Sequence, residues 1–379
     1  MTRHRVLVQS GAHRRRCVPL SIPLPEPCDE GRLVDESSGS QVPCQVQDGA
    51  LWFLLEKLDP QKTAQFTFEA GRTPAPTRSG VRMRHRKRAH EIDVRIGSKL
   101  FTTYHFAPGL PRPFLHPVHG PRGIALTRGF PMEPGEGETR DHPHHRSLWV
   151  AHGDVNGSDN WTEMPDHGTQ VARGGPLVVE GPVFGRMTQD LDWLNKAGEA
   201  VVAETRQYQF YACRGPRRLM DLTVRFQARS GAPVRFGDTK EGGICAVRVA
   251  TTMDGSRGGR IENSIGGVGE AECWGRPAHW VDYSGTAGGR QMGIAIFDHP
   301  QNLRHPTPWH VRNYGLFAAN PFALHDYDQG LAEDGSHTLA AGESLVFRYR
   351  LLLHTRDARG ARVADHYHGY VNPPSVEVS

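Results

Sequence analysis

Glycine and proline punctuate this chain so often that long helices are excluded over most of its length. The 379 residues include 43 glycines and 28 prolines, which destabilise helix interiors and favour turns. Between them lie short runs in which apolar and polar residues alternate, among them "RVLVQ", "EIDVRIG" and "SLVFRYRLLLH". Alternation with a period of two is typical of strands that bury one face. The sequence therefore predicts a mainly β protein.

Two units are predicted along the chain. Residues 1–72 read as a small N-terminal β unit, and the Pro- and Thr-rich segment 71–80 is the best candidate for a linker. Residues 81–379 contain too many strand-like runs for a small barrel and predict two large packed antiparallel sheets, a supersandwich. Only "ARVADHYHGYV", near the C-terminus, has a helical period.

Charge and cysteine content argue against several classes of protein. The formal net charge is +4. The basic runs at 13–17 and 82–88 lack interleaved aromatic residues, so we expect solvated faces and no nucleic-acid partner. The six cysteines form no CxxC pair, which predicts reduced thiols rather than a zinc knuckle or a disulfide scaffold. No segment reads as a signal peptide or a membrane span, so we expect a soluble, cytoplasmic protein without a membrane partner.

The densest group of chemically active side chains is "RDHPHHRSLWVAHGDVNGSDNW", residues 140–161. An apolar stripe along the predicted strand "SLWVAH" would bring His152 to the strand end, where sites are often found. Three interpretations remain open. The histidines could bind a metal together with Asp141 or Asp154, transfer protons near pH 7, or only hydrogen-bond and shape a loop.

Two later segments add carboxylates, cations and tryptophans. In "GDTKEGG", residues 237–243, Lys240 and Glu241 precede a glycine pair that would let a ligand or another backbone approach closely. Residues 261–285 combine two tryptophans with acids and amides. Indole faces stack on the CH faces of sugars while acids and amides bond their hydroxyls, so this pattern suits a saccharide.

The segment 297–326 is a long polar loop with interleaved Trp, Tyr and Phe. Loops of this length in compact domains are usually functional or disordered, and the aromatic residues argue against disorder. His310 and Arg312, two positions apart, would point the same way on an extended chain. The sequence has no GxSxG elbow, P-loop or HExxH motif, and the usual serine-hydrolase and nucleotide-hydrolase functions are therefore not expected.

In this order, "DHPHHRSLWVAHGDVNG", "GDTKEGG", "GGVGEAECWG", "WVDYSG" and "FDHPQNLRHPTPWHVRNYGLFAANPF" resemble a bacterial family called the PmoA family, over most of residues 45–355. The family carries the label methane oxygenase. We regard that label as a misnomer, because a true methane monooxygenase subunit has spanning helices and no stretch here could cross a bilayer. Members tend to lie beside sugar-oxidising Gfo/Idh/MocA-type dehydrogenases, which implies a saccharide or glycoside substrate.

A weaker resemblance concerns "RPFLHPVHGPRGIALTR" and the histidine block that follows it. These are similar to the early region of aldose 1-epimerases, although the sequence departs from the epimerase pattern at many positions. The resemblance implies a galactose-mutarotase-like supersandwich, and the fold carries over more safely than the reaction.

We therefore expect a carbohydrate-active enzyme that performs acid–base chemistry, by epimerisation, elimination or hydrolysis, with its site in a cleft on one sheet. The expected catalytic residues are His144, His145, His152, Lys240, Glu241, His310 and Arg312. The expected substrate-binding residues are Arg146, Asp154, Asn156, Trp161, Glu270, Trp274, Asp282, Tyr283, His305, Trp309 and Asn320.

Two alternatives are retained. No cofactor is favoured, but a divalent metal would make the protein a metal-dependent oxidoreductase or lyase, with ligands drawn from His142, His144, His145 and His152. The third interpretation is a saccharide-binding protein without catalysis. The sugar, the bond and the oligomeric state stay open.

Overall fold

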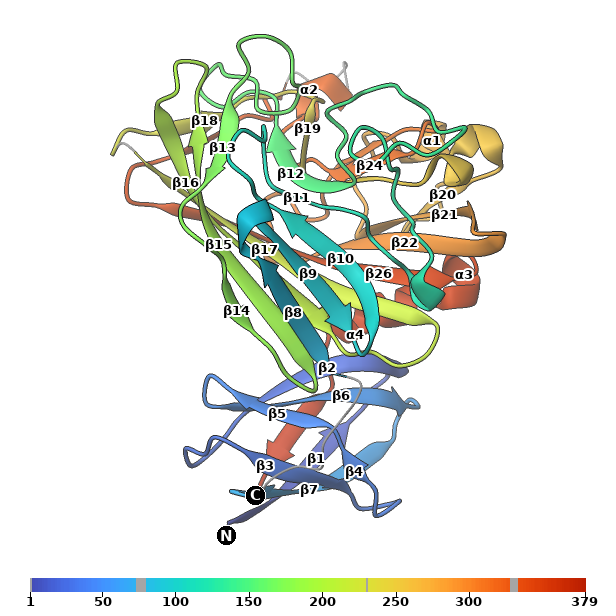
Figure 1. The fold of residues 1–379 in the computed structure, drawn as a ribbon. Coiled ribbons are helices and arrows are strands. Elements are labelled where there is room, and N and C mark those ends of the chain that lie inside the picture. The colour runs from blue at the N-terminus through green and yellow to red at the C-terminus, as the bar shows by residue number, and fades with distance from the viewer. Residues whose placement is uncertain (1, 73–79, 230, 328–332) are drawn as a thin grey trace.

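The computed structural model describes residues 2–72, 80–229, 231–327 and 333–379 (Figure 1). Most of the linker predicted at 71–80 lies outside the described residues. The chain is mainly β, with 48% strand and 9% helix, and its sheets form a sandwich. This confirms the predicted fold class.

One layer of the sandwich is an eight-stranded sheet with the order β23-β24-β19-β12-β11-β10-β9-β8. Its strands are β8 (Val81–Arg86), β9 (Glu91–Ile96), β10 (Lys99–His105), β11 (Phe114–Leu115), β12 (Leu148–His152), β19 (Gly242–Arg248), β23 (Trp309–Val311) and β24 (Leu316–Ala319). Neighbouring strands are antiparallel. The long segment between β11 and β12, which carries the histidines, has little regular structure.

The second layer is a nine-stranded sheet with the order β13-β15-β16-β17-β26-β22-β21-β20, to which β14 adds by pairing with β15. Its strands are β13 (Thr169–Ala172), β14 (Leu177–Val179), β15 (Phe184–Leu194), β16 (Ala200–Tyr211), β17 (Arg217–Ala228), β20 (Arg260–Asn263), β21 (Trp280–Ala287), β22 (Arg290–Asp298) and β26 (Ser344–Thr355). A separate pair joins β18 (Val234–Phe236) to β25 (His337–Leu339).

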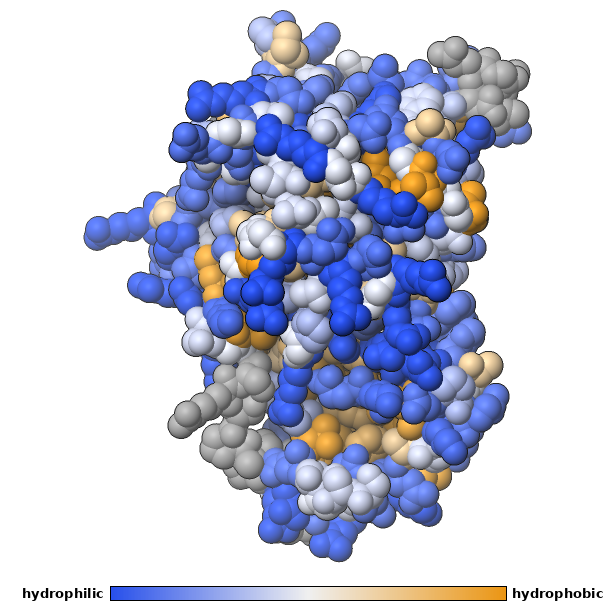
Figure 2. All heavy atoms as spheres, turned by 90° about the vertical axis from the view of Figure 1, so that its right-hand side faces the viewer, coloured by the Kyte–Doolittle hydropathy of each residue, from blue (hydrophilic) through white to orange (hydrophobic). Residues whose placement is uncertain are grey.

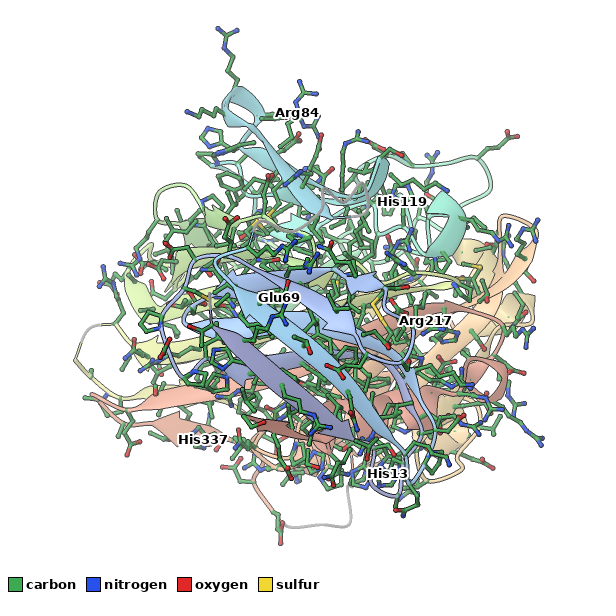
Figure 3. The ribbon with its side chains drawn as sticks, turned by 90° about the horizontal axis from the view of Figure 1, so that it is seen from below. His13, Glu69, Arg84, His119, Arg217 and His337 are labelled. Atoms are coloured by element: carbon green, nitrogen blue, oxygen red, sulfur yellow. A yellow bond between two sulfur atoms is a disulfide. The ribbon has the colours of Figure 1, made fainter. Side chains whose placement is uncertain are left out.

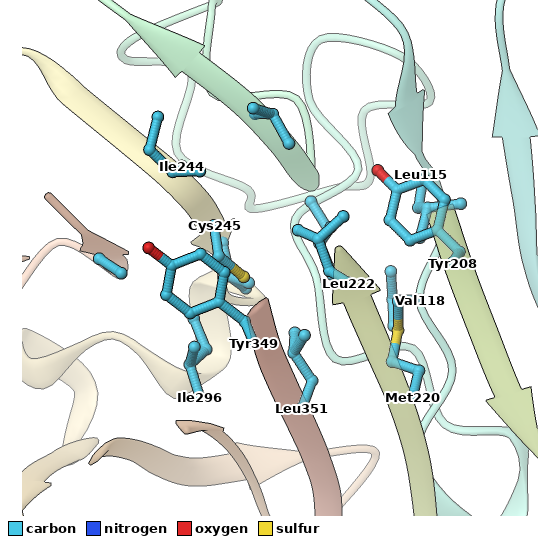
Figure 4. Packing of buried hydrophobic residues seen from close by; sticks show 14 of the residues in the cluster. Leu115, Val118, Tyr208, Met220, Leu222, Ile244, Cys245, Ile296, Tyr349 and Leu351 are labelled. Carbon is cyan, nitrogen blue, oxygen red and sulfur yellow. The ribbon is translucent and has the colours of Figure 1, made fainter. Parts of the chain in front are cut away.

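The main hydrophobic core lies between these two sheets. Leu115 and Ile244 enter it from the eight-stranded sheet, and Leu222 and Leu351 enter it from the nine-stranded sheet (Figure 4). All four side chains are at most 1% exposed. Because successive side chains of a strand point to opposite faces, each sheet presents a second face outside this core.

The N-terminal unit consists of two smaller sheets below the sandwich (Figure 1). Its strands are β1 (Arg3–Gln9), β2 (Arg15–Pro23), β3 (Gly31–Asp35), β4 (Gln41–Val42), β5 (Cys44–Gln47), β6 (Ala50–Leu58) and β7 (Thr63–Ala70). The last strand of the chain, β27 (Ser375–Val378), pairs with β1 and joins this unit. The predicted boundary placed residues 81–379 in the sandwich. It is wrong for β27, because Val376 and Val378 pack against the N-terminal core.

The helices are short. The described residues contain α1 (Glu270–Cys273), α2 (Leu324–Tyr327), α3 (Ala358–Ala361) and α4 (Val363–Val371), and four single 3-10 turns at Lys87–Ala89, Pro121–Gly123, Thr251–Met253 and Gly255–Arg257. α4 lies within the one segment for which the sequence indicates a helix. Among the described residues, no helix is long and apolar enough to cross a membrane.

Cys17 of β2 and Cys213, just after β16, form a disulfide. The bond joins the N-terminal unit to the sandwich across a separation of 196 residues. The prediction that the thiols are reduced is therefore wrong for this pair, because residues far apart in sequence come together where the two units meet. The free cysteines are Cys28, Cys44, Cys245 and Cys273.

Candidate functional site

The outer face of the eight-stranded sheet carries a row of four cross-strand partners. Trp149 of β12 pairs with Ala246 of β19, Ala246 with Ala318 of β24, and Ala318 with His310 of β23. Since partners in register have their side chains on the same face, two small methyl groups separate a tryptophan from a histidine. The row forms the floor of the candidate site, with the ring of Trp149 at one end and the ring of His310 at the other.

Trp161 packs over this floor. Its ring centroid lies 5.4 Å from that of Trp149 and 6.1 Å from that of His310, and its side chain belongs to the same cluster as Ala246 and Ala318. A Cβ added to Gly243 would lie 3.3 Å from Trp161 and 2.6 Å from the Ala318 Cβ. Gly243 therefore gives room first to Ala318 of the neighbouring strand and then to Trp161, whereas the sequence left open a ligand or another backbone.

Three histidine rings of the segment before β12 gather beside Trp161. The ring of His142 stacks on His145 and on Tyr314, at 4.8 Å between centroids in each case. The ring of His144 meets that of His145 edge to face at 4.4 Å. We call His142, His144, His145 and His310, together with Trp161, the histidine cluster.

Asp141 holds the cluster in place through two buried arginines. Its carboxylate accepts bonds of 2.6 Å from Arg128 and 2.8 Å from Arg248, whose side chains are fully buried. The same carboxylate lies 2.8 Å from Nδ1 of His142, and Arg248 lies 3.1 Å from Nδ1 of His145. Partial burial opposes ionisation of Asp141, but Arg248, His142 and Arg128 together lower its pKa to about 2.

Three histidines of the cluster have lowered pKa values. Burial, and then the charge of Arg112, lowers the pKa of His144 to about 4. Burial and Arg312 lower the pKa of His310 to about 3, and burial holds the pKa of His145 well below its ordinary value. These three rings are neutral at pH 7 and cannot donate a proton as imidazolium. The side chain of His142, by contrast, is 38% exposed.

Glu241 adds a carboxyl group to the rim of the cluster. Burial raises the pKa of Glu241, and the charges of Lys240 and Arg312 oppose this rise; His142 also lies within electrostatic range of this carboxyl group. Its side chain makes no hydrogen bond within the described parts of the chain. Nδ2 of Asn320 donates to the carbonyl oxygens of Thr239 and Lys240, at 2.9 and 3.2 Å, and thereby holds the backbone that leads into Glu241.

Arg312 places a positive charge near Glu241. Its Nη1 donates to Glu270 at 2.9 Å, and its guanidinium lies over the ring of Trp274 at 5.0 Å. The ring of Trp274 in turn meets Tyr327 edge to face at 5.1 Å. The candidate site thus combines carboxyl, imidazole, guanidinium and aromatic groups.

The structure brings together most, but not all, of the residues expected at the site. Those in or beside the cluster are His144, His145, Arg146, Trp161, Lys240, Glu241, Glu270, Trp274, His310, Arg312 and Asn320. Those held elsewhere are Asp154, Asn156, His152, Asp282, Tyr283, His305 and Trp309.

Each displaced residue has a structural partner. The Asp154 carboxylate accepts from the N–H of Gly157 in its own turn, and Oδ1 of Asn156 accepts from the N–H of Arg235. Asp282 binds His354 at 2.6 Å and His305 binds Asp298 at 2.7 Å. The rings of Tyr283 and Trp309 point into the main core.

His152 lies on the wrong face of β12 for the site. It follows Leu148 and Val150 in alternation, and both of these face the main core. Its Nε2 lies 2.9 Å from the Gly237 carbonyl oxygen, and its ring packs on Phe322 at 4.9 Å. The apolar stripe that suggested a catalytic role therefore places His152 inside the protein.

The four histidines considered as metal ligands do not converge, because His152 is on the other face. No group of three or more His, Cys, Asp or Glu side chains suited to a metal ion occurs in the described residues.

The sequence suggests little or no role for two acidic residues of this region. Asp141 appeared only as an optional metal ligand, and its position between two arginines has no local signal in the sequence. No sequence pattern points to Asp254. Its side chain is 1% exposed, and burial raises its pKa to about 7, against the opposing charge of Arg248.

Replacing Asp141 with Asn should lower stability at neutral pH and much less in acid. The pKa of Asp141 is lower in the folded protein than in the unfolded chain, so its stabilisation is complete above about pH 4 and is lost as the pH falls through about 2. We expect Asp141→Asn to cost about 1–2 kcal/mol at pH 6, after discounting for the partial exposure of the carboxylate. Denaturant unfolding should show this difference shrink to roughly a third of its pH 6 value at pH 2.5. The exposed Asp29→Asn is the control, and a difference independent of pH would contradict the assignment.

Comparison with known proteins identifies the family but not the activity. A model described as "Family of unknown function (DUF6807)" matches residues 91–368, more than half of the chain. The chain belongs to this family. Within DUF6807, the matched range includes the whole histidine cluster and Glu241. No curated protein matches, so the resemblance to the PmoA family stays a prediction.

Solved structures similar to this DUF6807 member are larger glycoside hydrolases. A glycosyl hydrolase family 38 protein from Enterococcus faecalis is 10% identical with a TM-score of 0.42, covering 100% of this chain and 47% of that chain. An alpha-mannosidase from Enterococcus faecalis V583 is 10% identical with a TM-score of 0.43, covering 100% and 46%. A GH36 alpha-galactosidase from Geobacillus stearothermophilus is 14% identical with a TM-score of 0.35, covering 69% and 40%. The chain spans less than half the length of each, and similarity this weak carries no argument about activity.

Proposed function

We propose that the protein is a carbohydrate-active enzyme that transfers protons on a saccharide, with His142 and Glu241 as the acid–base pair. The observation that carries the proposal is the pairing of Asp141 with His142 next to Glu241. Asp141 accepts the Nδ1 proton of His142, which leaves Nε2 of the same ring free to accept a proton. A carboxylate that orients an imidazole in this way is a recurrent arrangement in enzymes that use histidine as a base.

Glu241 supplies the complementary group. Because burial raises its pKa, Glu241 keeps its proton to a higher pH than an exposed glutamate and suits the role of acid. The positive charge of Arg312 opposes the rise in the pKa of Glu241 and contributes to the lowered pKa of His310. Its guanidinium would stabilise negative charge that develops on a substrate oxygen during proton abstraction.

The surroundings support a sugar as the substrate. Trp274 is only partly buried and carries Arg312 on its ring, which places an aromatic group at the site for contact with a pyranose ring. A histidine base with a single glutamic acid and an arginine favours proton abstraction beside a carbonyl, as in epimerisation or elimination. Most glycoside hydrolases instead use two free carboxyl groups, and here Glu270 is bound by Arg312 and by the backbone N–H of Asn313.

Exchange of carbon-bound protons tests this proposal. The protein would be incubated in D₂O with a panel of aldoses, keto-sugars and glycosides, and the sugars would be followed by proton NMR. We expect deuterium to enter at one carbon of at least one sugar, or an epimer or unsaturated product to form. Glu241→Gln should slow this reaction by about 10²- to 10⁴-fold, whereas the exposed Glu343→Gln should not.

The contrary results are equally clear. Binding of a sugar by calorimetry without exchange or product would make the protein a saccharide-binding protein. Exchange that survives in Glu241→Gln would remove Glu241 from the mechanism.

A further inference from the structure

A second polar site lies on the opposite side of the sandwich from the histidine cluster. A pocket of about 770 Å³ opens where β2 of the N-terminal unit, the nine-stranded sheet and the segment before α4 meet. Leu352 and His354 of β26 form part of its wall, and Leu352 belongs to a cluster outside the main core. The histidine cluster lies on the outer face of the other sheet, so the two sites are separate.

The lining of this pocket has an excess of positive charge. It contains no aspartate or glutamate, and its six arginines are Arg16, Arg122, Arg217, Arg290, Arg356 and Arg362. They come from five separate parts of the chain, which the fold brings together around one pocket. Figure 2 shows that the side of the molecule that carries α3 is covered mainly by hydrophilic side chains.

Carboxylates neutralise these arginines only in part. Asp365 lies 3.5 Å from Arg16 and 3.9 Å from Arg362. Arg217 is half-buried at the margin of the N-terminal unit (Figure 3) and interacts electrostatically with Glu56. In the described part of the chain, the guanidinium groups of Arg122, Arg217, Arg290 and Arg356 form no hydrogen bond or ion pair.

The lining also includes a buried imidazole without a partner. His366 of α4 is 6% exposed, and its ring forms no hydrogen bond with any other described residue. His354 beside it is 2% exposed and bound to Asp282 at 2.6 Å. Because His366 lines the pocket, a ligand bound there can form a hydrogen bond with its ring.

We propose that this pocket binds a small phosphorylated molecule through its phosphate group. Arginine presents a planar set of donors that matches phosphate oxygens in pairs, and a doubly charged anion would relieve the repulsion between neighbouring guanidinium groups. The volume lies within the range of small-molecule sites. This inference is independent of the proposed function.

Calorimetry with the full-length protein tests the proposal. The probes are inorganic phosphate, inorganic pyrophosphate and glucose 6-phosphate, with glucose as the uncharged comparison. We expect saturable binding of at least one phosphate probe, weakened by added NaCl because salt screens the charges. Binding of inorganic phosphate or pyrophosphate alone would identify a site for the free anion, and preference for glucose 6-phosphate would identify a site for phosphate esters.

Variants locate the binding in the pocket. Arg217→Gln with Arg290→Gln should weaken binding at least tenfold. Arg290→Gln with Arg356→Gln, both exposed, gives the same test if loss of the half-buried Arg217 impairs folding. The control pair is Arg84→Gln with Arg225→Gln, two exposed arginines outside the pocket that should change affinity less than twofold; Arg84 is labelled far from Arg217 in Figure 3.

Three results would overturn the proposal. They are no binding of any phosphate probe, an equal loss in the control pair, and binding that persists in both pocket variants.

Discussion

His142→Gln should lower the rate of proton transfer to a saccharide by about 10²- to 10⁴-fold, the range expected when a general base is removed. Glutamine approximates the size of histidine and can still bond to Asp141, but its amide does not accept a proton near pH 7. The kcat value should fall more than KM rises, because the substitution removes the group that accepts the proton in the transition state and not a group that binds the sugar.

The matched control for this variant is His85→Gln. His85 is an exposed histidine on β8 and should keep full activity. Both variants should keep the unfolding midpoint of the parent protein, since neither ring is deeply buried. If His142→Gln retains activity while Glu241→Gln loses it, the base must be another group of the cluster.

Glu204→Gln should destabilise the protein by about 3–5 kcal/mol, the cost of leaving one partner of a buried ion pair uncompensated. Glu204 of β16 and Arg206 of the same strand have fully buried side chains and pair at 2.6 Å. Oε2 of Glu204 also accepts the indole N–H of Trp193 at 2.6 Å. Although burial opposes the charge of Arg206, the Glu204 carboxylate raises the pKa of that guanidinium above its ordinary value. Removing Glu204 removes this support, but the arginine still stays charged because a guanidinium is not deprotonated in proteins.

Denaturant unfolding measures the effect on the free energy of unfolding. The exposed Glu343→Gln should change it by less than about 0.5 kcal/mol. A loss below about 1 kcal/mol for Glu204→Gln would mean that water or the side chain of Gln170, which already bonds Arg206 at 2.8 Å, compensates the charge.

The mainly β fold could be predicted because its signal is local. Period-two alternation predicts where strands run and which residues share a face, and the sandwich follows from their number. The same rule explains the one prominent error at the site. Leu148, Val150 and His152 do share a face, but it is the core face, and the opposite residue Trp149 turns towards the histidine cluster.

The remaining features depend on which distant segments pair. His310 joins Trp149 only because β23, β24, β19 and β12 are neighbours in one sheet with a particular register. Asp141 acquires its role from Arg248, more than one hundred residues away, and Cys17 pairs with Cys213 across two units.

By itself, then, the sequence determined the strands, their buried faces and the polar segments that carry chemistry, because the geometry of the extended chain sets these over a few residues. The tertiary structure alone decided that His142 lies within electrostatic range of Glu241 while His152 faces the core, and that six arginines line one pocket. These outcomes depend on sheet order and register, which are set by burial summed over the whole chain and not by any local pattern.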